Sequence, residues 1–305
     1  MTSTPTISNY SGSRLTGNLQ GMGWMVLASI GFAINNSLIR HLISTGLNPV
    51  EIAFFVNTFG VLALTPLFLH HGPTMLYTRQ FGFHVLRAVC YLAAMMLMYT
   101  ALATTPLALV AALNFTIPII TTILAIIFFH EVVQLRRWAA ILIGFFGTFI
   151  ILHPGLEIVE LGSLLVLLAA CFLSIMTTLA KLVAKTESTL TITAYTRLLL
   201  TPITLVVALF FWQWPSWLHL GLLMLAGIVE TGSILAYVQA IKVGETNVVM
   251  PINFSTLAWA SLIGFVIFTE VPSIYTWIGG FMIFGAALYI AYRESHPTSI
   301  TQITG

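Results

Sequence analysis

The stretch Asn114-Phe115-Thr116 returns 139 positions later as Asn253-Phe254-Ser255. Glu131 returns as Glu270 at the same spacing, because 253 − 114 and 270 − 131 both equal 139. Both copies place Asn-Phe inside a long apolar run and the glutamate at its end. An apolar block that recurs with the same polar residues indicates an internally duplicated membrane protein.

The composition also indicates a membrane protein. The chain has 305 residues, of which 58% are hydrophobic and 7% are charged, and its mean hydropathy is +1.00. A soluble domain cannot cover its surface with so few charges, whereas side chains that face lipid should be apolar. The polar residues 1–18 and 294–305 are expected to be disordered tails.

About ten apolar windows are long enough to cross a bilayer core about 30 Å thick. Their continuous hydrophobicity predicts an all-α membrane protein and disfavours a β-barrel, whose strands alternate. They fall into two sets of five, over residues 19–153 and 161–293. The windows are Leu19–Ile39, Pro49–Leu69, Phe81–Ala103, Leu107–Phe129, Arg137–Leu152, Gly162–Val183, Leu190–Trp212, Trp217–Val243, Thr246–Phe268 and Ser273–Tyr292.

The basic residues predict the orientation. With the N-terminus in the cytoplasm, nine of the 11 Lys and Arg residues fall on the inner side, Arg40 falls outside and Arg197 lies within a window. This asymmetry favours both termini in the cytoplasm. Because five is an odd number, the second half then enters from the opposite face, which predicts inverted repeats. In transporters, that arrangement places a site near the membrane midplane.

The motif at the end of the fourth window and its copy in the ninth resemble the drug/metabolite transporter superfamily, specifically its EamA-type families. This resemblance implies ten helices in inverted five-helix halves, a central cavity, and alternating access without nucleotide hydrolysis. It does not fix the substrate, because the family handles amino acids, nucleosides, sugars, cofactors and cationic drugs. The two copies read Pro106-Leu-Ala…Asn114-Phe-Thr-Ile-Pro118…Phe129-His-Glu131 and Gly244-Glu-Thr-Asn…Pro251-Ile-Asn253…Phe268-Thr-Glu270.

Glu230 is the most informative single residue, because it lies near the centre of the eighth window. A charge at that depth costs about 3 kcal/mol or more, so it is expected to face a partner or a cavity. At 1.5 Å per residue, Glu230 lies about 20 Å from the outer end of its window, and Arg197 about 10 Å from the inner end of its own. In a core about 30 Å thick, these distances from opposite faces give the same depth, so the side chains can pair. The pair is either a structural lock or a protonation switch and substrate anchor.

Arg197 also resembles the arginine found early in the second span of each family repeat. The corresponding position of the first half, near Asn57, carries no arginine. Any role that depends on this arginine is therefore expected in the second half of the chain alone.

Asn114 and Asn253 lie inside windows, close to Pro118 and Pro251. Proline frees a backbone carbonyl and kinks a helix, and an amide can satisfy that carbonyl or point into a cavity. The fourth and ninth windows are thus the expected hinged elements, with Pro118 and Pro251 as hinge candidates. Asn114 and Asn253 are equally candidates for binding substrate.

The other polar and aromatic candidates suit a small amphipathic or zwitterionic solute, although each alone is more often packing than a ligand contact. His84 and Arg87, near the cytoplasmic end of the third window, are expected to extend towards the lipid headgroups. Glu131 and Glu270 end their windows and are expected to accept hydrogen bonds at the start of the next helix or to fix the short turn. The remaining substrate-binding candidates are Asn57, Tyr195, Tyr99, Trp24 and Tyr237.

Several classes of protein are disfavoured. The chain has no aspartate, no His-Glu-x-x-His motif and no nucleophile elbow, which argues against an enzyme. No Cys/His spacing resembles a zinc site, no cofactor is indicated, and a net charge of +2 does not suggest nucleic acid. An ATP-driven pump would need a phosphate-binding loop, which the sequence lacks.

The sequence therefore predicts a secondary transporter in a bacterial inner membrane. Export of an amino acid or a related metabolite is the leading hypothesis, and uptake of a cationic cofactor-like metabolite such as S-adenosylmethionine is the alternative. A channel is the alternative mechanism, although no filter or charged ring is visible. A coupling proton and a homodimer are further expected partners.

Overall fold

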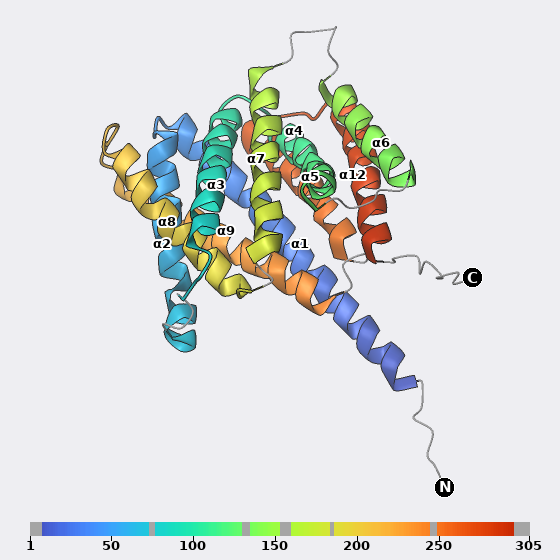
Figure 1. Ribbon diagram of the computed structural model, residues 1–305. Coiled ribbons are helices and arrows are strands. Elements are labelled where there is room, and N and C mark those ends of the chain that lie inside the picture. Colours follow the sequence, from blue (N-terminus) through green and yellow to red (C-terminus); the bar gives the residue numbers. More distant parts are fainter. Residues whose placement is uncertain are drawn as a thin grey trace, which may run out of the picture.

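The computed structural model describes residues 8–72, 77–129, 135–152, 160–183, 186–244 and 249–295 (Figure 1). These residues form helices joined by short connections, and none of them lies in a strand. The first part of the chain contains α1 (Ser8–Ser44), α2 (Pro49–His71), α3 (Phe81–Leu102), α4 (Leu107–Asn114), α5 (Thr116–Phe129) and α6 (Leu135–Leu152). The second part contains α7 (Leu161–Val183), α8 (Thr189–Ala208), α9 (Trp217–Val243), the 3-10 helix η2 (Met250–Phe254), α11 (Ser255–Phe268) and α12 (Ile274–Ser295).

The helices have the length and composition of membrane spans. Within the described residues, seven stretches are long and apolar enough to cross a bilayer, and Leu142–Ile151, Ile252–Phe268 and Ile274–Ala286 are shorter apolar helices. Large apolar side chains such as Phe149 and Phe265 are exposed, as lipid contact requires. A helix satisfies its own backbone groups, which lipid cannot do. The predicted all-helical membrane class is confirmed.

Local signals fix where several helices begin. The Asn48 side chain accepts a hydrogen bond from the Val50 backbone amide at 2.9 Å, and Pro49 opens α2. Ser188 caps α8 and Ser216 caps α9 in the same way. Such residues satisfy amides that have no partner inside the helix.

The N-terminal segment differs from expectation, because α1 begins at Ser8 and not near Leu19. Ser8–Asn18, which was expected to be disordered, is therefore helical. An α-helix makes its backbone hydrogen bonds internally, so it can continue beyond the apolar residues that mark a span. Residues 1–7 and 296–305 lie outside the described part of the chain.

The fourth and ninth windows are broken helices and not continuous ones. Asn114 ends α4 and Thr116 starts α5, while η2 precedes α11. Pro118 is the third residue of α5, and Pro251 lies at the start of η2. Because the amides of a first helical turn have no helical partner, proline fits there. Pro118 therefore lies in the first turn after the break at Phe115, and Pro251 lies in the 3-10 segment that precedes the break before Ser255.

The helices pack in pairs that relate the two parts of the chain. α1 packs against α9 and α3 against α7, while α2 packs against α8 and α6 against α12. Adding 139 to the residue numbers converts α1 into α7 and α3 into α9. The α1–α9 contact is thus the counterpart of the α7–α3 contact, and α2–α8 and α6–α12 each join an element to its own counterpart.

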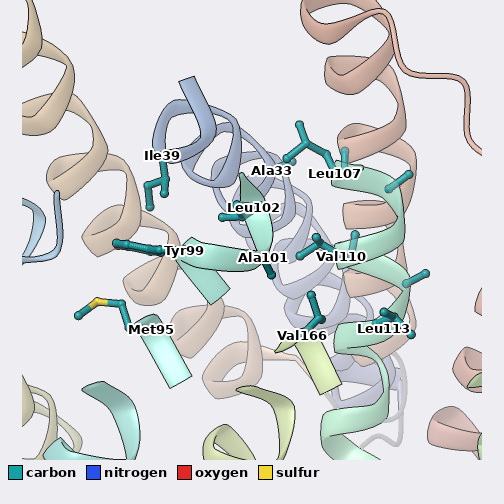
Figure 2. Packing of buried hydrophobic residues seen from close by; sticks show 14 of the residues in the cluster. Ala33, Ile39, Met95, Tyr99, Ala101, Leu102, Leu107, Val110, Leu113 and Val166 are labelled. Carbon is teal, nitrogen blue, oxygen red and sulfur yellow. The ribbon is translucent and has the colours of Figure 1, made fainter. Parts of the chain in front are cut away.

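Close helix approach depends on glycine at specific points. A Cβ atom at Gly147 of α6 would lie 2.8 Å from the carbonyl oxygen of Gly279 in α12. Gly147 and Gly279 therefore lie directly against each other. Among the described residues, the largest apolar cluster draws mainly on α1, α2, α3 and α4, and Figure 2 shows Ile39, Leu102 and Leu107 within it.

Candidate functional site

Four side chains from four helices meet in the interior, and we call them the central polar cluster: Asn57 of α2, Tyr91 of α3, Arg197 of α8 and Glu230 of α9. Arg197 Nη2 lies 3.0 Å from Glu230 Oε1, and Arg197 Nη1 donates to Asn57 Oδ1 at 2.8 Å. The Tyr91 hydroxyl donates to Glu230 Oε1 at 2.8 Å. The pairing anticipated from depth alone is confirmed.

The cluster is buried near the middle of its helices. The side chains of Arg197 and Glu230 are 3% and 8% exposed. Glu230 is 13 residues from each end of α9, which is about 20 Å at 1.5 Å per residue. Burying two ions is costly, and the cost is recovered only when geometry and additional hydrogen bonds are good. Asn57 and Tyr91 supply those bonds, whereas Glu230 Oε2 has no hydrogen-bond partner among the described residues.

Small residues let the helices approach around this cluster. A Cβ atom at Gly227 of α9 would lie 2.8 Å from Phe59 Cβ and 2.9 Å from the Val56 carbonyl oxygen, both in α2. In the same way, a Cβ atom added at Gly60 of α2 would lie 3.1 Å from Thr231 Oγ1 of α9. Both contacts hold α2 and α9 at the distance at which Asn57 and Glu230 share Arg197.

Gly227→Ala is expected to destabilise the protein by about 1–3 kcal/mol, because the added methyl group overlaps backbone that cannot move easily. Gly232→Ala, on the same helix, is the matched control, since no atom lies within 4 Å of its added Cβ. The midpoint of thermal unfolding in detergent distinguishes the two variants. Equal midpoints would show that the α2–α9 contact does not depend on Gly227.

The cluster brings together positions that correspond in the two halves. Tyr91 and Glu230 are separated by 139 residues, and Asn57 and Arg197 by 140. Arg197 corresponds to Thr58, so its partner Asn57 is the residue next to its first-half counterpart. Sequence reasoning missed Tyr91, and subtracting 139 from Glu230 would have identified it.

A second pair of corresponding positions meets at the helix breaks. The rings of Phe115 and Phe254 stack with centroids 5.0 Å apart and an interplanar angle of 29°. Asn114 Oδ1 is buried without a hydrogen-bond partner among the described residues. Asn253 Oδ1 accepts a long hydrogen bond of 3.5 Å from Thr256. The two amides thus flank the stacked rings rather than joining the central polar cluster.

The aromatic candidates are distributed around the cluster. Tyr99 is buried in the core near Glu230 and Arg197. Tyr195 stacks on His84 with centroids 4.6 Å apart, and Tyr237 lies edge-on to Phe32. Trp24 is 42% exposed, so it lies on the surface of the structure and not at the cluster.

Two expectations about charged residues near helix ends are corrected. His84 and Arg87 do not extend to the headgroups, because they are 0% and 2% exposed and contact Glu187 and the Ile192 carbonyl of the second half. Glu270 does not bind the next helix. It accepts from the Leu107 amide at 3.0 Å, at the start of α4, and pairs with Arg40. Glu131 lies outside the described residues.

The part of the chain that the structure describes contains no group of three His, Cys, Asp or Glu side chains that could hold a metal ion. It contains instead a neutralised, hydrogen-bonded ionic cluster deep among apolar helices, shared between two related halves. Intramembrane ionisable groups of this kind mark solute or ion pathways. This combination defines a membrane transport protein.

A protein-family model confirms this class and makes it specific. The model of the EamA-like transporter family matches residues 19–153 and 160–292. The chain belongs to the EamA-like transporter family, within the drug/metabolite transporters, and is an integral membrane transporter of small metabolites.

Individual relatives are similar over nearly their whole length. A protein of Rickettsia felis named S-adenosylmethionine uptake transporter is 28% identical, over 92% of this chain and 95% of that protein. A riboflavin transporter of Vibrio cholerae is 32% identical, over 91% and 94%. A solved crystal structure with 16% identity superposes with a TM-score of 0.60, over 92% of this chain and 99% of that one, and it supports the fold.

Proposed function

We propose that this protein carries a cofactor-type metabolite into the cell by alternating access across a bacterial inner membrane. The substrate class is a planar nitrogen heterocycle that bears a hydroxylated sugar or sugar-alcohol group. S-adenosylmethionine and riboflavin share this chemistry, and relatives of similar identity are named for each. These names favour the uptake alternative over amino-acid export, the leading hypothesis from the sequence.

The observation that carries a carrier mechanism is the central polar cluster, which is buried and shared between the two halves. In the proposal, Glu230 exchanges its Arg197 contact for a proton or for a cationic group of the substrate. Because Arg197 balances Glu230 in this structure, no net charge is left at the cluster, and a zwitterionic or neutral substrate is accommodated as well as a cation. Either exchange would change the packing of α8 on α9.

The proposal includes ten spans in two inverted five-helix halves. The matching helix pairs and the contacts between corresponding residues support a two-fold relation. α1 begins at the end of the bundle at which α12 ends, as both termini in the cytoplasm require (Figure 1). The distribution of Lys and Arg supports the same orientation.

The function is tested with purified protein in proteoliposomes, using riboflavin and radiolabelled S-adenosylmethionine as probes and single amino acids for comparison. We expect saturable uptake of a heterocyclic probe and none of the amino acids. Transport of amino acids alone would contradict the proposed substrate class. Currents far faster than a carrier can cycle would identify a channel instead.

The orientation is tested by labelling single engineered cysteines in intact cells with an impermeant maleimide. Glu160→Cys, before α7, is expected to be labelled from outside, and Arg79→Cys, before α3, only after permeabilisation. Both positions are exposed, so accessibility within the protein does not bias the comparison. The reverse pattern would refute the proposed orientation.

A further inference from the structure

A second polar group, centred on the buried His84, joins the two halves about 10 Å along α3 from Tyr91. Glu187, between α7 and α8, accepts from the Thr78 hydroxyl and lies 2.6 Å from His84 Nε2. Beside it, Gln80 Nε2 donates to Thr186 Oγ1 at 2.6 Å. We call these five residues the Glu187 latch. It joins the segment before α3 and the start of α3, in the first half, to the α7–α8 connection of the second half.

The Glu187 latch has the geometry of a charge-assisted contact. The His84 side chain is 0% exposed and that of Glu187 is 7% exposed. Burial raises the pKa of Glu187, but hydrogen bonds from Thr78 and His84 and the charge of His84 together lower it below its ordinary value. Glu187 is therefore ionised at neutral pH. A carboxylate with a lowered pKa contributes stability above its ordinary pKa, and the contribution is lost as pH falls through the lowered value.

A corresponding contact lies at the other end of α2. Glu51 is 1% exposed, and its Oε1 accepts from the Gln213 backbone amide at 2.5 Å. The neighbouring Trp212 ring packs on Phe54 and Phe55, with centroids 5.9 and 5.6 Å away. We call this group the Glu51 latch. It joins the start of α2, in the first half, to the segment before α9 in the second half.

The two latches use corresponding segments at opposite ends of the bundle. Adding 139 to residue numbers carries the start of α2 close to the start of α8, and the segment before α3 onto the first turn of α9, a few residues after Gln213. Helix α2 has 23 residues, or about 34 Å at 1.5 Å per residue, and separates Glu51 from Thr78. The central polar cluster lies between them. Both latches are closed in this structure.

We propose that the Glu187 latch and the Glu51 latch are the two gates of the transport path, and that each cycle breaks one while the other stays closed. This inference rests on the proposed carrier function. Each latch spans the boundary between the halves, so the halves cannot separate at that end while it is intact. The polar contacts in each latch are few and can exchange with water at modest net cost, and the Glu51 latch must also release the Trp212 ring from Phe54 and Phe55.

The first test is a reversible cross-link, Gln80→Cys with Thr186→Cys, in protein whose native Cys90 and Cys171 are replaced by alanine. Oxidation is expected to lower riboflavin or S-adenosylmethionine uptake at least about tenfold, because a locked gate stops the cycle. Reduction should restore it. The two single-cysteine variants, oxidised in the same way, are the matched controls.

The outcomes separate this inference from the proposed function. If the cysteine-free parent protein transports neither probe, the proposed function fails. If the parent transports and the oxidised double variant, shown to be cross-linked by a gel-mobility shift, transports equally fast, the gate inference fails. A similar loss in oxidised single-cysteine variants would also overturn it.

A second test distinguishes a gate from ordinary stabilisation. Glu187→Ala and Glu51→Ala each favour opening at one end, so they should shift the half-saturating substrate concentration on a given face in opposite directions. We expect shifts of about threefold or more in uptake by cells, with reversed signs in inverted vesicles. Shifts in the same direction, or no shift in folded variants, would contradict the proposal.

Discussion

Arg197→Ala is expected to lower the free energy of unfolding by about 3–5 kcal/mol, the loss typical when one partner of a buried ion pair is removed. Glu230 would stay buried with the Tyr91 hydroxyl as its hydrogen-bond donor, and Asn57 Oδ1 would lose its guanidinium donor. The loss is measured as a decrease in the midpoint of thermal unfolding in detergent. Lys242→Ala, which removes an exposed cation from α9, is the matched control and should change stability by no more than about 0.5 kcal/mol.

The charge origin of this effect is tested by adding Glu230→Gln to Arg197→Ala. The double variant buries no unpaired charge, so it should recover most of the lost stability. If its midpoint is as low as that of Arg197→Ala, the loss arises from packing around the guanidinium and not from the uncompensated carboxylate.

Glu230→Gln alone separates the functional role of the pair from its structural one. The amide keeps the size of the carboxylate while removing its charge. Protein that folds should lose pH-dependent uptake of the heterocyclic probe in proteoliposomes. Transport with normal rate, affinity and pH profile would mean that Glu230 only links α8 and α9.

Phe115→Ala is expected to lower the free energy of unfolding by about 3–5 kcal/mol, as large-to-small substitutions of buried aromatic residues do. Phe115 is 8% exposed, stacks on Phe254, and lies edge-on to Phe284 at 6.4 Å between centroids. The same unfolding measurement applies. Phe265→Ala is the control, because this ring is 58% exposed and its removal leaves no internal cavity.

A double-mutant cycle shows whether the two helix breaks are linked. Phe115→Ala and Phe254→Ala should couple by about 0.5–1.5 kcal/mol beyond their separate effects, because stacked rings interact directly. Additive losses would mean that each ring merely fills space. Strong coupling would support a mechanism in which α4–α5 and η2–α11 move together.

The helical membrane class was predictable because hydropathy reports burial in lipid directly. The breaks at Phe115 and before Ser255 were not located, since an apolar run reads the same whether its backbone is continuous or interrupted. Pro118 and Pro251 marked the right neighbourhood. Their missing amides, however, fit the first turn of a new segment as well as a kink, and sequence alone does not separate the two.

The part of the candidate site that could be predicted is the pair of charged residues that lie at the same depth in the membrane. Glu230 and Arg197 stand out because a charge inside an apolar window needs a partner. Tyr91 does not stand out, since a tyrosine in such a window usually belongs to the core. His84 and Glu187 were not paired because their contact crosses 103 residues and depends on how the halves dock.

The contacts between corresponding residues bear on how such a chain can arise. In a dimer of two identical halves, a residue on the two-fold axis would meet its own copy, so a buried glutamate would face a glutamate and an arginine an arginine. Like charges at that depth repel strongly, and neutral residues are the stable solution. Joining both halves in one chain removes this restriction. Tyr91 can then face Glu230, and Asn57 can face Arg197, so the fused chain can place one Arg197–Glu230 pair where a symmetric dimer would place two copies of each charge.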